Sequence, residues 1–531
     1  MGNIKQEIEK RRTFAIISHP DAGKTTLTEK FLLYGGAINL AGSVKGKATA
    51  RHAVSDWMEI EKQRGISVTS SVLQFNYDNY CINILDTPGH QDFSEDTYRT
   101  LMAADSAVMV IDGSKGVEAQ TRKLFKVCAM RHIPIFTFIN KMDRDAMDMF
   151  ELLDDIEKEL GIATCPINWP IGSGKSFKGV YDREKQQVHV FSDTEKGTKE
   201  GEDKVLNMDE AAEYIGEDLK NQLFDEIELL DGASAEFDQE QVDKGLLSPV
   251  FFGSALTNFG VEIFLKNFLK MTSSPLPRKA DVGMIDPMEE DFSAFVFKIQ
   301  ANMNKAHRDR IAFMRICSGK FDAGMEVFHV QTGKKQRLSQ PQQMMAQDRK
   351  IVDEAYAGDI IGVFDPGIFS IGDTICDKKM NIEFEGIPTF APERFAIVEQ
   401  IDSMKRKQFA AGMQQIAQEG AIQIFFEPNG GLERVIVGVV GELQFEVLES
   451  RMDSEYKVKF RRTATEYQFI RRYLNKDVLP TSLNLYDTKW VKDVRGRDYL
   501  IFRSEWCIKW AYEKNEGIEL AEFGTAQDDD E

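Results

Sequence analysis

The sequence predicts an α/β domain followed by a small β-barrel and a ferredoxin-like α+β domain. Three observations predict this architecture. Short apolar strands alternate with helical segments from residue 13 to about 275. Many short strands separated by turn residues follow at about 290–385, and a β-α-β-β-α-β order of segments spans about 395–460. With 531 residues, the chain is also too long for one hydrophobic core, so several domains are expected.

The first domain is predicted to comprise residues 1–277. Its strands are expected at 14–17, 72–77, 81–85, 107–111, 133–139 and 250–252, and its helices at 24–33, 120–131 and 150–160. Runs rich in Val, Ile and Phe that are separated by helices are typical of βαβ units and a largely parallel sheet. A polar, acidic stretch at about 165–249 interrupts the alternation, and we interpret it as an insertion. The sequence S-S-P-L-P at 273–277 is typical of a linker.

The β-barrel is predicted at 278–388, where turn signals such as Ser318-Gly319 and Pro366-Gly367 separate short strands. The third domain is predicted at 389–531. Its strands are expected at 395–400, 422–426, 434–440 and 456–460, with helices at 403–418 and 441–451, which is the ferredoxin-like order. Residues 463–531 contain no motif that we can name, and we treat them as a C-terminal extension.

Charge and composition restrict the function. A net charge of -20 argues against a protein that coats nucleic acid through a global positive field. Two local basic clusters can still dock on a nucleoprotein, although a solvated face is the simpler interpretation of each: Lys405, Arg406 and Lys407; and Arg461, Arg462, Arg471 and Arg472. The six scattered cysteines indicate free thiols in a reducing compartment. Without a signal peptide or a long apolar run, the protein is expected to be cytoplasmic, with no membrane partner.

The strongest motif is S-H-P-D-A-G-K-T-T at 18–26, between a predicted strand and a predicted helix. Successive backbone N–H groups at a helix N-terminus compensate the charge of a phosphate chain. The Lys24 ammonium can reach the outer phosphates, and the Thr25 hydroxyl can ligate Mg²⁺. This pattern predicts a P-loop that binds nucleotide through His19, Asp21, Ala22, Gly23, Lys24, Thr25 and Thr26.

The second motif is D-T-P-G-H at 86–90, at the end of the strand predicted at 81–85. The Asp86 carboxylate can hold Mg²⁺ through water, and the Gly89 N–H can sense a γ-phosphate. His90 is the candidate catalytic residue, because a side chain at this turn orients the attacking water in P-loop enzymes. Between the first two motifs, the Ser67 hydroxyl of R-G-I-S can complete the Mg²⁺ ligands when GTP is present.

Two further motifs point to guanine. Asp143 of N-K-M-D can accept hydrogen bonds from guanine N1–H and the 2-amino group, whereas adenine would leave this carboxylate unpaired. Asn140 is expected to tie the loop, and the Lys141 stem can cover the purine face. In Gly253-Ser254-Ala255, a backbone N–H of Ser254 or Ala255 can read guanine O6. All four motifs follow predicted strands, at the edge where doubly wound sheets bind ligands. The sequence therefore predicts a GTPase that uses GTP, GDP and Mg²⁺.

Together, H-x-D-x-G-K-T, R-G-I-S, D-T-P-G-H, N-K-M-D and G-S-A resemble the motifs of the translational GTPases of the ribosome. The resemblance covers about residues 1–460. Chain length, the P-loop and the aromatic C-terminus are most similar to the bacterial class II release factors. The resemblance implies a ribosome-stimulated GTPase that drives dissociation and recycling of codon-reading release factors after translation termination. The implied partners are the ribosome and those release factors.

The resemblance also implies that ribosomal RNA of the large subunit positions His90, so hydrolysis should be slow without ribosomes. It further implies a monovalent cation near Asp21 and a monomer off the ribosome. Two alternatives remain: another translational GTPase, related to elongation factor G or to the ribosomal protection proteins, and a non-catalytic module whose nucleotide state only selects partners. The short segment after the ferredoxin-like part disfavours the first alternative, and His90 and Ser67 disfavour the second.

Overall fold

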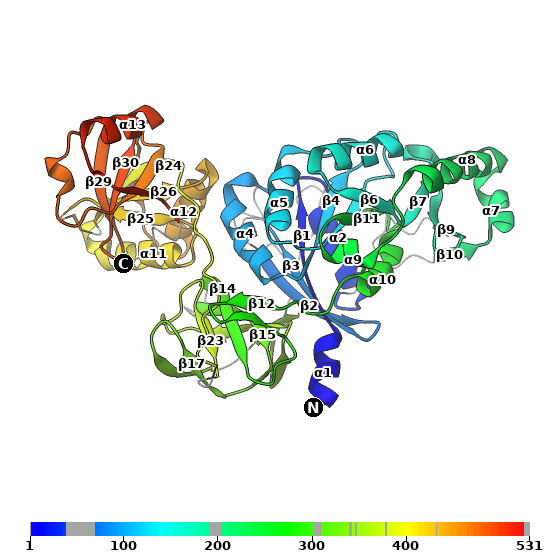
Figure 1. The fold of residues 1–531 in the computed structure, drawn as a ribbon, viewed down its shortest axis with the longest axis horizontal. Helices are drawn as coiled ribbons and strands as arrows, with labels where there is room; N and C mark the ends of the chain where they lie inside the picture. The colour runs from blue at the N-terminus through cyan, green and yellow to red at the C-terminus, as the bar shows by residue number, and fades with distance from the viewer. Residues whose placement is uncertain are drawn as a thin grey trace.

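The computed structural model describes residues 2–38, 70–191, 203–301, 310–338, 342–345, 348–377, 380–428, 430–431 and 433–524. Figure 1 shows three units, with the first domain at the right, a barrel below it and a third domain at the left. This arrangement confirms the predicted fold class. Within the described ranges, no helix combines the length and the apolar character that crossing a membrane requires.

The first domain is built on a seven-stranded sheet with the order β2-β3-β1-β4-β5-β11-β6. All neighbouring strands are parallel except β2 and β3. The central strands are buried along their whole length, which explains why they were recognisable as continuous apolar runs. The strands are β1 (Arg11–Ser18), β2 (Ser71–Tyr77), β3 (Tyr80–Asp86), β4 (Ser106–Asp112), β5 (Ile135–Asn140), β6 (Ala163–Pro166) and β11 (Leu247–Phe252).

Helices cover both faces of this sheet. Successive residues of β1 point to opposite faces, so Phe14 packs with α2 and α10, whereas Ala15 packs with α4, α5 and α6. The helices are α2 (Lys24–Tyr34), α4 (Ser94–Ala103), α5 (Ala119–Met130), α6 (Met149–Leu160) and α10 (Val261–Met271). The carboxyl ends of the parallel strands are left open between the helices, and the loops that follow them carry the predicted motifs.

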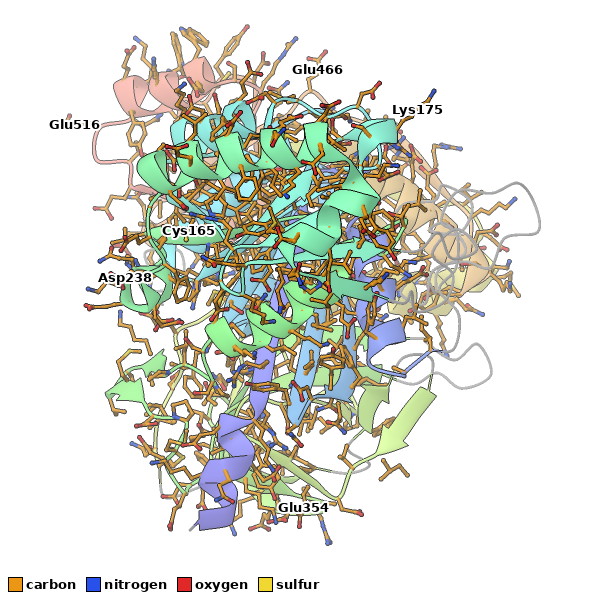
Figure 2. All side chains as sticks on the ribbon, turned by 90° about the vertical axis from the view of Figure 1, so that its right-hand side faces the viewer. Cys165, Lys175, Asp238, Glu354, Glu466 and Glu516 are labelled. Atoms are coloured by element: carbon orange, nitrogen blue, oxygen red, sulfur yellow. The ribbon has the colours of Figure 1, made fainter. Side chains whose placement is uncertain are left out.

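A separate four-stranded antiparallel sheet fills the stretch that interrupts the alternation, with the order β10-β9-β8-β7. The buried Trp169 anchors it, and its Nε1 donates to Glu226 at 2.7 Å. Figure 2 shows the helices of this added unit facing the viewer, between Lys175 and Asp238. Its elements are β7 (Asn168–Ile171), β8 (Gly179–Asp182), β9 (Gln187–Phe191), β10 (Asp203–Leu206), α7 (Met208–Ile215), α8 (Glu217–Ala233) and α9 (Gln239–Asp243).

The second domain is a β-barrel whose main sheet has the order β18-β17-β23-β14-β15-β22-β19-β20, with a second pair β16-β21. Helix α1 (Gly2–Glu9) extends from the first domain and buries Ile8 in the barrel core. The strands are β14 (Ser293–Ala301), β15 (Arg310–Ser318), β16 (Lys320–Asp322), β17 (Glu326–His329), β18 (Lys334–Arg337), β19 (Gln342–Met345), β20 (Asp348–Ile351), β21 (Glu354–Tyr356), β22 (Ile360–Phe364) and β23 (Thr374–Cys376); a short hairpin, β12 (Arg278–Ala280) and β13 (Gly283–Ile285), precedes them.

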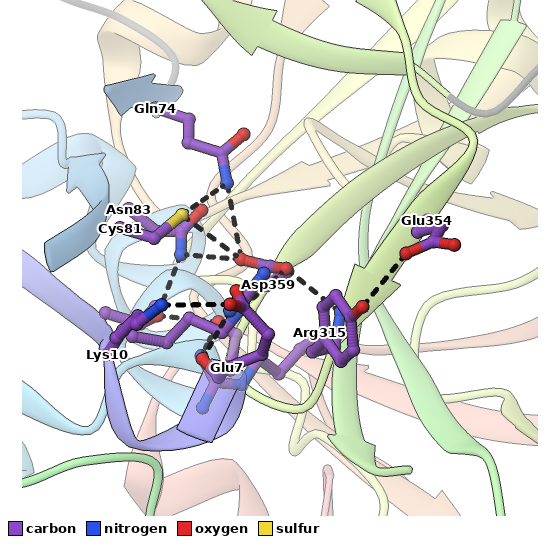
Figure 3. A network of polar contacts seen from close by, with 12 residues as sticks. Glu7, Lys10, Gln74, Cys81, Asn83, Arg315, Glu354 and Asp359 are labelled. Carbon is purple, nitrogen blue, oxygen red and sulfur yellow. Dashed lines mark hydrogen bonds and ion pairs between the residues drawn. The ribbon is translucent and has the colours of Figure 1, made fainter. Parts of the chain in front are cut away.

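Asp359 joins the barrel to the first domain. Its buried carboxylate accepts hydrogen bonds from Arg11 Nε at 2.8 Å and from Gln74 and Asn83, each at 3.3 Å (Figure 3). Burial alone would lower the pKa of Arg11, but the neighbouring Asp359 carboxylate outweighs this effect and raises that pKa, so the guanidinium stays charged. Gln74 and Asn83 lie on β2 and β3. The barrel is therefore held directly to the two strands that precede the D-T-P-G-H loop.

The third domain begins with the ferredoxin-like sheet order β27-β24-β26-β25. Beyond β25, the same sheet continues through β29-β30-β28-β31, so the C-terminal extension completes one eight-stranded sheet. The elements are β24 (Arg394–Gln400), η4 (Ser403–Lys405), α11 (Arg406–Gln418), β25 (Gln423–Phe426), β26 (Arg434–Val439), α12 (Glu442–Ser454), β27 (Phe460–Ala464), β28 (Phe469–Tyr473), η5 (Pro480–Ser482), β29 (Thr488–Asp493), β30 (Asp498–Phe502), α13 (Glu505–Lys514) and β31 (Leu520–Glu522).

The strand predicted at 456–460 is wrong in position, because β27 begins only at Phe460. Tyr456 and Val458 are buried against the helices of this domain, and the Tyr456 hydroxyl donates to Gln415 at 2.6 Å. Between them, Lys457 adopts a left-handed φ of 58°. A residue in that conformation interrupts the extended backbone, so the strand starts later.

The six cysteines are all free thiols, as predicted.

Candidate active site

The P-loop connects the end of β1 to the start of α2. Gly23 precedes the helix with a left-handed φ of 101°, and a Cβ at this position would lie 2.2 Å from Asn140 Nδ2. Glycine is thus required both by the backbone and by the close approach of a neighbouring loop. Asp21 also has a positive φ, of 66°, and is exposed. These turns bring the loop to the N-terminus of α2, where backbone N–H groups are available to an anion.

Lys24 and Asp86 form a buried ion pair in which Nζ and Oδ1 are 2.5 Å apart. Asp86 ends β3, and the P-loop that leads to Lys24 follows the neighbouring parallel strand β1. The second oxygen of Asp86, Oδ2, is buried and has no hydrogen-bond partner among the described residues. A buried carboxylate oxygen without a partner is costly unless a ligand, water or ion satisfies it. Asp86 therefore fits the expected Mg²⁺ site, with the half-buried Thr25 in the first turn of α2.

Asn140 links three of the predicted loops. Its Nδ2 donates to the Ala22 carbonyl at 2.8 Å, and its Oδ1 accepts from the Ala255 N–H at 2.8 Å. Asn140 ends β5, which lies between β4 and β11 in the sheet. The P-loop, the N-K-M-D loop and the G-S-A loop are consequently held in one arrangement by a single amide side chain.

The predicted base-recognition residues are also brought together. Ser254 Oγ donates to Asp143 Oδ1 at 2.6 Å, which orients this carboxylate and leaves Oδ2 outside that bond. Lys141, with a left-handed φ of 71°, donates from Nζ to Asp112 Oδ2 at 2.6 Å. Burial raises the pKa of Asp112, but hydrogen bonds from Lys141 and Ser114 outweigh it, so that this pKa is lowered.

Asp112 was not singled out from the sequence, although a signal was available. It ends β4 just as Asp86 ends β3, and both strands run parallel to β1, which lies between them, so their carboxyl ends lie at the same edge of the sheet. Its role is to hold the ammonium of Lys141 in place.

His19 was predicted in the P-loop, and its Nε2 lies 3.4 Å from Glu118 Oε1, another carboxylate that the motifs did not indicate.

His90 lies at the entrance to a short 3-10 helix, η1 (Gln91–Phe93), with its side chain 36% exposed. The Asp92 N–H donates to His90 Nδ1 at 3.2 Å. The Asp92 carboxylate accepts from the Leu443 N–H at 2.8 Å, at the N-terminus of α12 in the third domain. A Cβ on Gly441 would lie 2.0 Å from Asp92 Cγ, so glycine is needed for this approach. The loop of the candidate catalytic histidine is therefore attached to the third domain.

Gly89 and Thr26 lie where the motifs predicted them, in the turn after β3 and the first turn of α2. Thr87, between Asp86 and Gly89, ties that turn to β1 by donating from Oγ1 to the Ile16 carbonyl at 2.6 Å. Ser67, the remaining predicted Mg²⁺ ligand, lies outside the described residues. The other predicted residues surround the carboxyl ends of β1, β3, β5 and β11.

Three protein families match successive parts of the chain. Residues 9–274 match the elongation factor Tu GTP binding domain, residues 291–378 match elongation factor G domain 2, and residues 384–512 match the C-terminal domain of class II release factor RF3. A crystal structure of the protein ttk003000868 from Thermus thermophilus has a TM-score of 0.69 at 21% identity, covering 88% of this chain and 71% of that one. That likeness supports the fold.

The similarity to the following relatives covers nearly the whole chain. Peptide chain release factor 3 of Symbiobacterium thermophilum is 58% identical over 520 residues, which cover 98% of each chain. Peptide chain release factor 3 of Gloeothece citriformis is 51% identical, over 97% of this chain and 96% of the relative. With its GTP-binding domain, its barrel and its C-terminal domain all matched, the chain belongs to the peptide chain release factor 3 family.

Proposed function

We propose that this translational GTPase acts on ribosomes after peptide release, where it uses GTP to stimulate dissociation and recycling of the codon-reading release factors. The observation that supports this proposal is that one chain combines a GTP-binding domain with the C-terminal domain of the class II release factors. That C-terminal domain and the relatives' names favour termination over elongation or ribosomal protection. The six free thiols agree with action in the cytoplasm, which is a reducing compartment.

The Lys24–Asp86 pair supports a specific mode of GTP binding. The triphosphate of GTP competes for the Lys24 ammonium, because it carries more negative charge than one carboxylate. Asp86 would then be free to hold Mg²⁺ through water, and the hydroxyl groups of Thr25 and Ser67 would be its direct ligands. When bound, Mg²⁺ neutralises charge on the phosphate oxygens. Asp143 and the backbone of Ser254 and Ala255 recognise guanine, and Lys141 covers the purine.

His90 holds the attacking water. In hydrolysis the water oxygen forms a bond to the γ-phosphorus, the bond from phosphorus to the β-γ bridging oxygen breaks, and the water proton passes to the phosphate products. The half-exposed position of the ring supports a requirement for an outside contact, which we assign to ribosomal RNA of the large subunit. A monovalent cation beside the exposed Asp21 can assist at the phosphates. Off the ribosome, the protein acts as a monomer.

The decisive experiment measures GTP turnover by the full chain without ribosomes, with vacant ribosomes, and with ribosomes that hold a codon-reading release factor after peptide release. We expect slow turnover alone, strong stimulation by ribosomes, and faster release-factor dissociation only with GTP. His90→Ala should bind GTP within about threefold of wild type and lose the stimulation, which in P-loop enzymes commonly exceeds about a hundredfold. Full stimulated turnover in this variant would show that another group positions the water. Unchanged release-factor dissociation would exclude the recycling role.

A further inference from the structure

Two basic segments of the third domain, separated by about 50 residues in sequence, meet in the structure. Strands β24 and β27 are antiparallel, with Gln400 opposite Phe460, so the chain that leaves β24 runs beside the chain that enters β27. Lys405 Nζ donates to the Lys457 carbonyl at 2.6 Å and fixes the two segments together. We define the basic surface as the six cations of this junction: Lys405, Arg406, Lys407, Lys457, Lys459 and Arg461.

The charge on the basic surface is only partly neutralised. Arg406 pairs with Glu433, and Arg461 lies 3.9 Å from Glu399, which is already paired with Arg434 at 2.7 Å. In the part of the chain that the structure describes, Lys407, Lys457 and Lys459 are exposed and form no ion pair. A cluster of unpaired ammonium groups is unexpected on a chain with a net charge of -20, because a solvated face normally mixes both signs.

Exposed apolar side chains accompany the cations. Met404 is 88% exposed and Ile401 is 60% exposed, and both lie in the segment between β24 and α11. These two apolar side chains are exposed among the cations of the basic surface, whose lysines have long, flexible side chains. This combination suits a ligand that carries regularly spaced negative charges and also offers flat sugar and base surfaces.

We propose that the basic surface docks on the phosphate backbone of folded RNA. The identification of this RNA as ribosomal rests on the proposed function. Lysine is depleted at protein–protein interfaces, and aromatic anchors are enriched there, so an acidic protein is the poorer match. Lys407, Lys457 and Lys459 form phosphate contacts, and the other three cations add to the positive field. Met404 and Ile401 pack against ribose. The surface is distant in sequence from the nucleotide loops and is not needed for GTP binding.

The test uses a full-length double variant that carries both Lys407→Gln and Lys459→Gln. The matched control carries both Lys476→Gln and Lys509→Gln, which remove the same charge from two exposed lysines elsewhere on this domain. Binding to ribosomes is titrated at several KCl concentrations. Loss of two phosphate contacts should weaken binding about tenfold at moderate salt and reduce the slope of log K against log salt by about 1.5. The control should stay within about twofold, and GTP affinity should be unchanged in both.

A photo-crosslinker in place of the exposed Met404 identifies the partner on the same ribosomes. Crosslinks to RNA support the proposal, and crosslinks to protein alone overturn the RNA assignment. If wild-type protein binds ribosomes but the double variant matches it in affinity and salt slope, the basic surface has no docking role and the proposed function stands. If wild-type protein fails to bind ribosomes, both the surface assignment and the proposed function fail.

Discussion

At the scale of single residues, the site depends on short polar contacts between loops rather than on the loops alone. Asn140 holds the P-loop and the G-S-A loop, and Ser254 orients Asp143. Each contact satisfies a buried polar group, so each loop is stabilised by its neighbours. The close packing of Gly23 against Asn140 follows from this arrangement and makes the P-loop intolerant of even one added carbon.

Gly23→Ala should therefore reduce GTP affinity at least tenfold and destabilise the fold by about 1–3 kcal/mol, because the added Cβ strains a left-handed residue and displaces Asn140. Fluorescent GDP titration and urea unfolding measure the two effects. Gly36→Ala is the matched control, since Gly36 has a positive φ of 65° but no atom within 4 Å of the place that a Cβ would take. Equal nucleotide affinities for the two variants would contradict the packing argument.

Asp143→Asn should shift preference from GTP toward xanthosine triphosphate. An amide can donate a hydrogen bond to the 2-oxo group of xanthine, whereas the carboxylate can accept one from the 2-amino group of guanine. Competition between the two nucleotides for the purified protein measures the preference, and Asp154→Asn, at a 66% exposed side chain, is the control. An unchanged competition profile would refute the assignment of Asp143 to the base.

At the scale of elements, η1 and α12 form the contact between the D-T-P-G-H loop and the third domain. The negative Asp92 carboxylate lies at the N-terminus of α12, where the helix dipole and a free N–H group favour it. A second contact lies nearby, where Arg99 of α4 donates to the Gly420 carbonyl at 3.3 Å just after α11 ends. Helix α11 starts in the basic surface, so this one element connects that surface to α4.

Asp92→Ala should expose the N-terminus of α12. The buried hydrogen bond to the Leu443 N–H is worth about 1.5–3 kcal/mol as a bond to a charged group, so exchange of this amide with solvent should accelerate roughly ten- to a hundredfold. Hydrogen exchange followed by mass spectrometry measures it. Asp453→Ala removes an exposed carboxylate from the other end of α12 and should have no effect there. Unaltered exchange in Asp92→Ala would mean that other contacts hold the helix.

At the scale of the whole molecule, the first domain and the barrel are joined by buried charges. Asp359 holds Arg11, Gln74 and Asn83, and Asp105 separately binds Arg315 at 2.5 Å and Arg278 at 3.0 Å. Such pairs are sensitive to the loss of one partner, because the remaining charge is buried without compensation. The contacts of the third domain with the first include those of Asp92 and Arg99 and a ring contact between Tyr98 and Phe390.

Asp359→Ala should lower the free energy of unfolding by about 3–5 kcal/mol, because it removes the buried carboxylate partner of Arg11 and leaves only the partly exposed Glu7 to pair with this buried guanidinium. Urea unfolding measures the change. Asp322→Ala removes a 60% exposed carboxylate paired with Lys320 on the same domain, and should cost less than about 1 kcal/mol. Comparable losses in the two variants would show that the Asp359 network contributes no more than a surface pair.

The success of the sequence-based predictions depended on how local the signal was. Strands β1, β4 and β5 were recognisable because strands buried on both faces are apolar at every position. Strands β28 and β29 were missed, because each has one partly exposed face and reads as mixed polarity. Their partners lie far away in sequence, and β29 joins the sheet beside β25. No pattern of consecutive residues indicates such a pairing.

By itself, the sequence determined the type of each domain, the order of the nucleotide-binding loops and the chemistry of their side chains, since motif spacing and periodicity are properties of consecutive residues. Only the tertiary structure decided which side chains meet: Lys24 with Asp86, Lys141 with Asp112, Asp92 with the amide of Leu443, and Lys405 with the segment of Lys457. The physical reason is that these contacts join residues on different loops or domains. They depend on how the elements pack against one another, and short stretches of chain contain no information on that packing.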